Sequence, residues 1–235
     1  MSNTLPVFPR PCIVVARYNE NLDWLKPLGK ENYNFIVYNK GKDDIDRDFF
    51  DNVIQLENIG REGHTYLYHI IKNYRNLSDA TMFIQGDIKD HTDSGYSPTD
   101  YIKMCLATCL QHPTGVSQNA HSIEYDKCLY WFNRINCNTP HLVAPFKDDM
   151  SLGQWLEFIS GKRQSCTKMK WCHGGIFAAT KGAITGVSLE NWKLILETLS
   201  YHINPTTGHY LERSMYHILT TANPCKAHIN RTYIL

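Results

Sequence analysis

The first candidate for chemistry is the polar segment Gln85-Gly86-Asp87, which follows a short apolar run at residues 81–84. Such a run is typical of a buried strand, and a glycine at its end lets the backbone come close to a ligand. Asp87 then offers hard oxygen ligands to Mn²⁺ or Mg²⁺, and the same loop supplies two more candidate ligands. An aspartate directly after a strand is also an ordinary turn residue, so this alternative stays open. The candidate metal ligands are Asp87, Asp90 and His91.

Two other apolar runs also end in polar loops. Residues 12–16 lead into residues 17–20 (RYNE), and residues 35–38 lead into Asn39 and Lys40. Ligands of open α/β sheets bind outside the carboxyl ends of the strands, so we expect these loops to share one rim. Together they supply an aromatic ring, amides, basic groups and carboxylates, the mixture that a nucleotide diphosphate with a divalent cation requires.

A fourth candidate is the segment at residues 58–64 (NIGREGH), which opens a long helical pattern. The backbone N–H groups of a helix start can receive a phosphate, and Arg61 can add a bidentate contact. A tight turn at Gly60 with Glu62 as a helix-start charge explains the same residues equally well. Neither GxxxxGK[ST] nor GxGxxG occurs, which removes the main support for a P-loop kinase or a Rossmann dehydrogenase.

The segment at residues 171–177 (WCHGGIF) is a candidate sugar contact. Its paired glycines allow close backbone approach, and a tryptophan can stack on the apolar face of a sugar. We predict one strand over residues 171–179, and His173 is a candidate catalytic residue. A β-bulge at the glycines and a structural histidine are the competing explanation.

Glu212 is the candidate general base. It lies at the edge of the apolar stripe of a final helix that we predict to begin at Gly208. If burial raises its pKa, this carboxylate can take a proton from an acceptor hydroxyl. A Glu–Arg surface feature near a helix start is an equally good explanation.

The elements that must hold these residues alternate between strands and helices. The pattern predicts one α/β domain with a central, mostly parallel mixed sheet flanked by helices, and it assigns nucleotide binding to about residues 12–110 and the acceptor or sugar to about residues 111–235. Residues 111–150 look irregular or hairpin-like. The predicted strands are 12–16, 35–38, 53–56 and 81–84, and the predicted helices lie at 66–74, after Ser97, at 151–159, after Ser188 and at 208–219.

The composition narrows the class of protein. The chain has 235 residues, of which 43% are hydrophobic and 20% charged, enough for a sizeable core. Its net charge of +1 gives no overall field for nucleic acid or an anionic membrane. We expect a soluble cytoplasmic protein, because no segment resembles a membrane span or a signal peptide. The eight cysteines form no pair of CxxC motifs, so we expect reduced, mostly buried thiols.

The order of these segments resembles a known family. The strings at residues 15–20, 38–41, 58–67, 83–91, 174–177 and 209–213 are similar to those of a family known only as a domain of unknown function. That family resembles the GT-A class of nucleotide-sugar glycosyltransferases, including small ones of large algal DNA viruses. The resemblance covers residues 12 to about 220, and for a viral protein it places the chain in the host cytoplasm.

The resemblance implies a GT-A fold, a UDP-sugar donor, a glycan or protein hydroxyl as acceptor, and Mn²⁺ or Mg²⁺. It places the loop after the first strand beside the uridine, and the paired glycines beside the transferred sugar or the acceptor. GT-A enzymes carry Asp-x-Asp where this chain has Gln85-Gly86-Asp87, so Asp87 remains the main ligand, helped by Asp90 or His91. The donor-binding residues that it implies are Ala16, Arg17, Tyr18, Asn19, Asn39, Arg61, Gln85, Gly86, Gly174 and Gly175.

Two other functions compete with sugar transfer. The missing first carboxylate favours a non-catalytic nucleotide- or glycan-binding module on the same fold. The carboxylates and histidine near Asp87 also suit a metal-dependent phosphoester hydrolase, although two-metal sites draw on more ligands.

Overall fold

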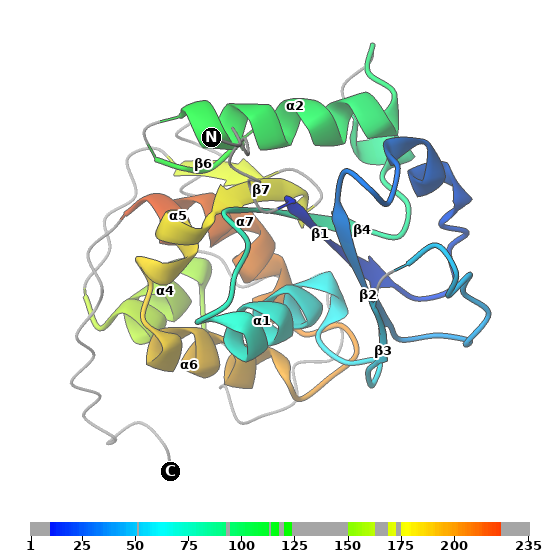
Figure 1. The fold of residues 1–235 in the computed structure, drawn as a ribbon. Helices are drawn as coiled ribbons and strands as arrows, with labels where there is room; N and C mark the ends of the chain where they lie inside the picture. Colours follow the sequence, from blue (N-terminus) through cyan, green and yellow to red (C-terminus); the bar gives the residue numbers. More distant parts are fainter. Residues whose placement is uncertain are drawn as a thin grey trace.

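Five strands form the central sheet, in the order β3-β2-β1-β4-β7 (Figure 1). β1 (Cys12–Arg17), β2 (Asn34–Asn39), β3 (Asn52–Gln55) and β4 (Ala80–Gln85) are parallel, and β7 (Phe177–Thr180) pairs antiparallel with β4. The computed structural model describes residues 10–50, 52–92, 95–112, 114–117, 120–123, 150–162, 169–172 and 175–221. The predicted α/β domain with a mostly parallel mixed sheet is confirmed.

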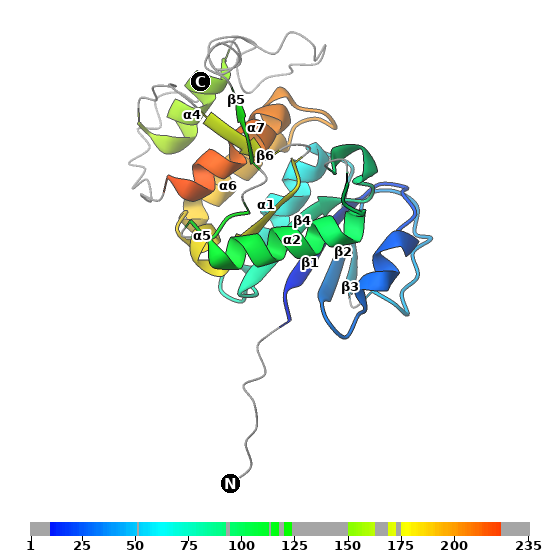
Figure 2. The same ribbon diagram turned by 90° about the horizontal axis from the view of Figure 1, so that it is seen from above.

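Helices cover both faces of this sheet (Figures 1 and 2). One hydrophobic core joins the sheet to α1 (Arg61–Asn73), α4 (Leu152–Ser160), α6 (Leu189–Leu199) and α7 (Thr206–Thr220). The other core joins it to the 3₁₀ helix η1 (Asp23–Leu28) and to α2 (Pro98–Gln111). Alternate strand residues serve the two cores, because successive side chains of a strand point to opposite faces.

Side-chain caps fix where several helices begin. Ser97 accepts a hydrogen bond from the backbone N–H of Asp100 at 3.1 Å, with Pro98 in the first turn, as predicted. Ser188 caps α6 in the same way, and Ser151 forms a capping box with Gln154 at the start of α4. These three helix starts are confirmed.

The single strand predicted over residues 171–179 is wrong. The structure has two strands there, β6 (Met169–Cys172) and β7, with Gly175 between them at φ 69°. β6 pairs with β5 (Ala120–Ile123) in a separate two-stranded sheet, so the chain changes sheets at the glycine. The other predictions for residues 124–149 lie outside the described residues.

The final helix begins earlier than predicted. α7 starts at Thr206, after Pro205, rather than at Gly208. Proline has no N–H to leave unpaired at a helix start, which explains why the helix begins directly after it. Two short elements had no sequence prediction: α5 (Lys181–Thr185) and the 3₁₀ helix η2 (Lys89–His91).

Cys12, Cys105 and Cys109 are buried and take part in no disulfide. This agrees with the predicted reduced thiols for that part of the chain. No helix among the described residues is long and apolar enough to cross a bilayer.

Candidate functional site

The candidate residues gather at the carboxyl edge of the sheet. β1, β2 and β4 run parallel, so the loops after them emerge at one edge, and the antiparallel β7 begins at that edge. From β1 the sheet grows through β2 and β3 in one direction and through β4 in the other. The carboxyl ends of β1 and β4 are therefore the position where ligands of open α/β sheets bind.

Arg17 holds two rim loops together and is buried, with 5% of its surface exposed. Its Nε donates to the carbonyl of Glu20 at 2.8 Å, and its Nη1 donates to Asn39 Oδ1 at 2.9 Å and to the carbonyl of Lys42 at 2.8 Å. Its Nη2 pairs with Asp44 at 2.5 Å. Both Arg17 and Asn39 thus point into this network and shape the rim that was predicted to contact the nucleotide.

The loops after β1 and β2 also touch directly. Asn19 Oδ1 accepts from the backbone N–H of Lys42 at 3.1 Å. A Cβ at Gly41 would lie 1.6 Å from the carbonyl oxygen of Tyr18, so only glycine fits there. The Tyr18 side chain remains half exposed, which leaves an aromatic ring on the rim for stacking.

Gly86 lies against Glu20 at the carboxyl ends of β1 and β4. Its N–H donates to the carbonyl of Ala16 at 2.9 Å, and a Cβ on it would lie 2.6 Å from Glu20 Oε2. Asp87 follows and is exposed, and its Oδ1 accepts from the backbone N–H of Lys89 at 3.0 Å. Asp87 therefore forms the turn that was its alternative explanation, and its side chain is exposed to solvent.

The predicted metal ligands do not form a preassembled cluster. Among the described residues, no group of three or more His, Cys, Asp or Glu side chains is placed to hold an ion. Asp90 is exposed, Gln85 is half-buried at the end of β4, and His91 lies at the end of η2.

The start of α1 has an unusual backbone. Gly60 has φ 63° and Arg61 has φ 52°, and Arg61 is the one non-glycine residue with positive φ in the described part of the chain. Their N–H groups donate to the carbonyls of His202 at 2.8 Å and Ile203 at 3.2 Å. The loop between α6 and α7 therefore holds the left-handed turn at Gly60 and Arg61, which we call the α1 corner. A left-handed non-glycine residue costs about 1 kcal/mol or more, and such strain is concentrated at functional sites.

Lys40, which the sequence placed on the rim, stabilises the α1 corner through hydrogen bonds to its backbone. Its Nζ donates to the carbonyls of Ile59 at 2.5 Å and Arg61 at 2.6 Å. Burial lowers the pKa of Lys40 to about 8, and the negative charge of Glu62 opposes that shift. The ammonium group therefore holds the left-handed turn in place instead of contacting solvent.

The Arg61 side chain points toward α7. Its Nη1 donates to His209 Nδ1 at 2.9 Å, while His209 Nε2 donates to Asn204 Oδ1 at 3.1 Å. Burial, followed by the charges of Arg61 and Arg213, lowers the pKa of His209 to about 4, so this ring is neutral at physiological pH. Arg61 also lies 3.4 Å from Glu62, and about a third of its side chain is exposed.

Glu212, the candidate general base, lies on α7 and is mostly shielded from solvent. Only 16% of its side chain is exposed, and its ion pair with Arg213 is long at 3.9 Å. Burial raises the pKa of Glu212, and the negative charge of Glu62 raises it further against the opposing charges of Arg213, Arg61 and His91. The predicted condition for a general base, a carboxyl group whose pKa is raised by burial, is met.

Gly175 lies between the two glutamates. A Cβ on it would lie 3.5 Å from Glu62 Oε1 and 3.8 Å from Glu212 Cγ. The structure therefore places Gly175 beside Glu212, and the charges of Arg61 and His91 both act on Glu212. His173 and Gly174 lie outside the described residues.

Sequence reasoning missed the partnership of Glu62 with Glu212. Glu62 was noticed only as a helix-start charge, and no local spacing connects α1 with α7. The sequence holds one indirect signal. Glu62 and Tyr66 are four residues apart, so both side chains lie on one face of α1, and the buried Tyr66 shows that this face points into the protein.

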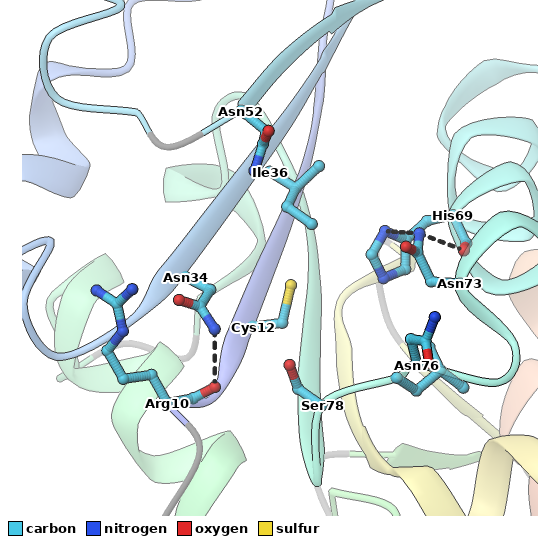
Figure 3. A pocket seen from close by; sticks show the side chains of 10 residues that line it. Arg10, Cys12, Asn34, Ile36, Asn52, His69, Asn73, Asn76 and Ser78 are labelled. Atoms are coloured by element: carbon cyan, nitrogen blue, oxygen red, sulfur yellow. Dashed lines mark hydrogen bonds between the residues drawn. The ribbon is translucent and has the colours of Figure 1, made fainter.

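A pocket of about 340 Å³ lies at the opposite edge of the sheet (Figure 3). Its wall includes the first residues of β1, β2 and β3, and it faces the end of α1. Ligands of parallel sheets bind at carboxyl ends, so we assign the chemistry to the carboxyl edge despite this pocket. The residues lining the pocket are Arg10, Cys12, Asn34, Ile36, Asn52, His69, Asn73, Asn76, Leu77 and Ser78.

Comparisons with known proteins identify a family. No curated protein and no solved structure matches the chain. The model of one family, described as "Protein of unknown function (DUF3431)", matches residues 13–232, a span that includes the whole carboxyl-edge site. The chain therefore belongs to the DUF3431 family.

Proposed function

We propose that this protein is a glycosyltransferase that moves a sugar from a UDP-sugar donor to a hydroxyl group of a glycan or protein, assisted by Mn²⁺ or Mg²⁺. The observation that carries the proposal is the position of Glu212: a mostly buried carboxylate that lies beside Gly175 at the carboxyl edge of the mostly parallel sheet, where burial raises its pKa. A general base works best when its pKa lies near the working pH, and burial moves a carboxylate in that direction.

The surroundings of Glu212 supply the other groups that this reaction requires. Arg61 stands at the start of α1 with part of its guanidinium exposed, and it can bind a phosphate oxygen. Tyr18, in the loop after β1, offers an exposed ring for stacking on a base. Gly175 keeps the space beside Glu212 free of a side chain, which leaves room for a sugar or acceptor hydroxyl.

The chemical step follows from these positions. Glu212 takes the proton of the acceptor hydroxyl, and the acceptor oxygen bonds to the anomeric carbon. The bond from that carbon to the diphosphate oxygen breaks, and UDP leaves with the electron pair. Because the base acts in a single displacement, we expect inversion at the anomeric carbon.

The residues present fit a divalent cation that is only partly held by protein. Mg²⁺ is commonly bound by one or two carboxylates together with substrate phosphates and water, so a cage of protein ligands is not required. Asp87 is exposed, and Glu20 Oε2 lies beside Gly86, so these two carboxylates would hold the ion. When bound, the cation neutralises charge on the leaving diphosphate.

The competing functions are less well supported. A two-metal hydrolase requires clustered ligands, and the described residues contain no such cluster. A binding module that had lost catalysis would have no use for a buried carboxylate that costs stability, whereas an active site retains such a group.

Sugar-donor turnover tests the proposal. We expect Mn²⁺-dependent release of UDP from at least one UDP-sugar, and we expect Glu212→Gln to abolish transfer while it spares UDP binding. Glu197→Gln is the matched control, because Glu197 is exposed on α6. The proposal fails if no donor is turned over, and unchanged turnover in Glu212→Gln removes Glu212 from its role.

A further inference from the structure

A second carboxylate shares the space beside Glu212. Glu62 lies in the first turn of α1, with 11% of its side chain exposed, and it contacts the same face of Gly175 that Glu212 approaches from α7. Two buried carboxylates that face one small space repel each other unless a proton or a cation lies between them.

The neighbouring arginines only weakly neutralise this pair. Arg61 lies 3.4 Å from Glu62 but also donates to His209, and Arg213 lies 3.9 Å from Glu212 while its Nη1 donates to the carbonyl of His209 at 2.9 Å. An optimal charge-assisted hydrogen bond is about 2.7–2.9 Å long, so neither arginine forms one with these carboxylates at the distances observed.

A buried hydroxyl next to the pair gives independent support. Tyr66 follows Glu62 by one helical turn, is 2% exposed, and its hydroxyl has no hydrogen-bond partner among the described residues. Burial raises the pKa of Tyr66, and the negative charges of Glu62 and Glu212 both add to that rise, so both carboxylates act on this hydroxyl. An unpaired buried hydroxyl costs free energy, so this polar atom near the two carboxylates is a second feature that apolar packing alone does not explain.

We propose that Glu62 is a positioning residue that acts through Glu212: it lies beside Glu212 on one face of Gly175, and its negative charge keeps Glu212 ready to take the proton of the acceptor hydroxyl. This rests on the proposed function. In the reaction, the acceptor O–H bond breaks and the proton goes to a Glu212 oxygen, where the charge of Glu62 stabilises it. The acceptor oxygen forms the new glycosidic bond, and the diphosphate carries away the electron pair.

The charged groups around Glu212 come from every described element near it. Glu62 and Arg61 lie on α1, His91 on η2, and Arg213 on its own helix. β6 also packs against α7 and includes Lys170 in its sequence. Glu62 is the one of the four described groups whose charge raises the pKa of Glu212, so its removal has a predictable sign.

The test is a carboxyl ¹³C NMR titration of the full chain labelled at glutamate, with the Glu212 signal assigned by its loss in Glu212→Gln. We expect the Glu212 midpoint to lie above that of free glutamate and to move to lower pH in Glu62→Gln. Glu197→Gln, which removes an exposed glutamate from α6, should leave the midpoint unchanged. A midpoint that is the same in Glu62→Gln and in the unaltered chain overturns the inference.

Glu62→Asp keeps the inference testable if Glu62→Gln does not fold. This variant keeps the negative charge but shortens the side chain by one methylene group, which moves the charge away from Glu212. The Glu212 midpoint should therefore fall by less than in Glu62→Gln. A Glu212 midpoint at or above that of the unaltered chain contradicts the inference. If UDP-sugars are turned over, the acidic limb of the kcat/KM profile should move to lower pH in Glu62→Gln while UDP binding is retained. A shifted NMR midpoint without turnover would reject the proposed function and keep the carboxylate pair.

Discussion

Replacing Lys40 by methionine tests the support of the α1 corner. Methionine fills similar space but removes the two donors to the carbonyls of Ile59 and Arg61, so the variant should be less stable at every pH. The pH dependence of that loss is the sharper prediction. The pKa of Lys40 is about 8 in the folded chain, against an ordinary value of 10.5.

The sign follows from proton linkage. Between these two pKa values the unfolded chain binds more protons at Lys40 than the folded chain, so the stability of the unaltered chain rises with pH. One pKa unit corresponds to about 1.4 kcal/mol, so Lys40 contributes a gain of about 2 kcal/mol between about pH 7 and about pH 9.5. The methionine variant lacks this gain. The difference in the free energy of unfolding between the unaltered chain and the variant should therefore grow by about 2 kcal/mol over this pH range.

Urea unfolding of both proteins in reducing buffer measures this difference, because other titrating groups cancel in the comparison. A deficit that stays constant across this pH range would refute the reasoning. It would mean that the two carbonyl contacts keep the ammonium at its ordinary pKa and outweigh the effect of burial.

Two further predictions concern the start of α1 and the candidate base. Arg61→Gly and Arg61→Ala both lose the contact with His209, but only glycine relieves the strain of the positive φ of 52°. Urea unfolding should therefore show that Arg61→Gly is more stable than Arg61→Ala by about 1 kcal/mol. Equal stability of the two variants would contradict the left-handed turn. Because the pKa of Glu212 is raised by burial and Glu62, its ionisation costs stability above the ordinary glutamate pKa. Glu212→Gln should therefore be more stable than the unaltered chain near neutral pH, with the gain lost in acid, and a loss of thermal stability at neutral pH would count against a buried carboxylate.

The sheet was predictable because its signals are local. Short apolar runs that end in polar loops gave β1, β2 and β4, and the Ser97-Pro98 cap gave the start of α2. The break at Gly175 was not predictable, since a glycine in an apolar run is compatible with a bulge or with a change of sheet, and tertiary pairing decides between them.

The site was predictable only in part, because tertiary packing decides where its side chains point. Sequence reasoning placed polar side chains at strand ends, but it does not tell whether a side chain points outward or into the protein. Arg17 and Asn39 turned inward to hold the rim, whereas Tyr18 stayed exposed. The meeting of Glu62 with Glu212 depends on how α1 and α7 pack, which no local pattern encodes.

The most direct test of the central claim, that the carboxyl edge binds a UDP-sugar with a divalent cation, is a calorimetric titration with UDP in the presence and absence of Mn²⁺. We predict binding that Mn²⁺ strengthens and that Asp87→Ala weakens. Asp79→Ala is the matched control, because Asp79 is an exposed aspartate that precedes β4 at the opposite edge, whereas Asp87 follows β4. Absence of UDP binding, or equal weakening by the two substitutions, would contradict the assignment of the site to this edge.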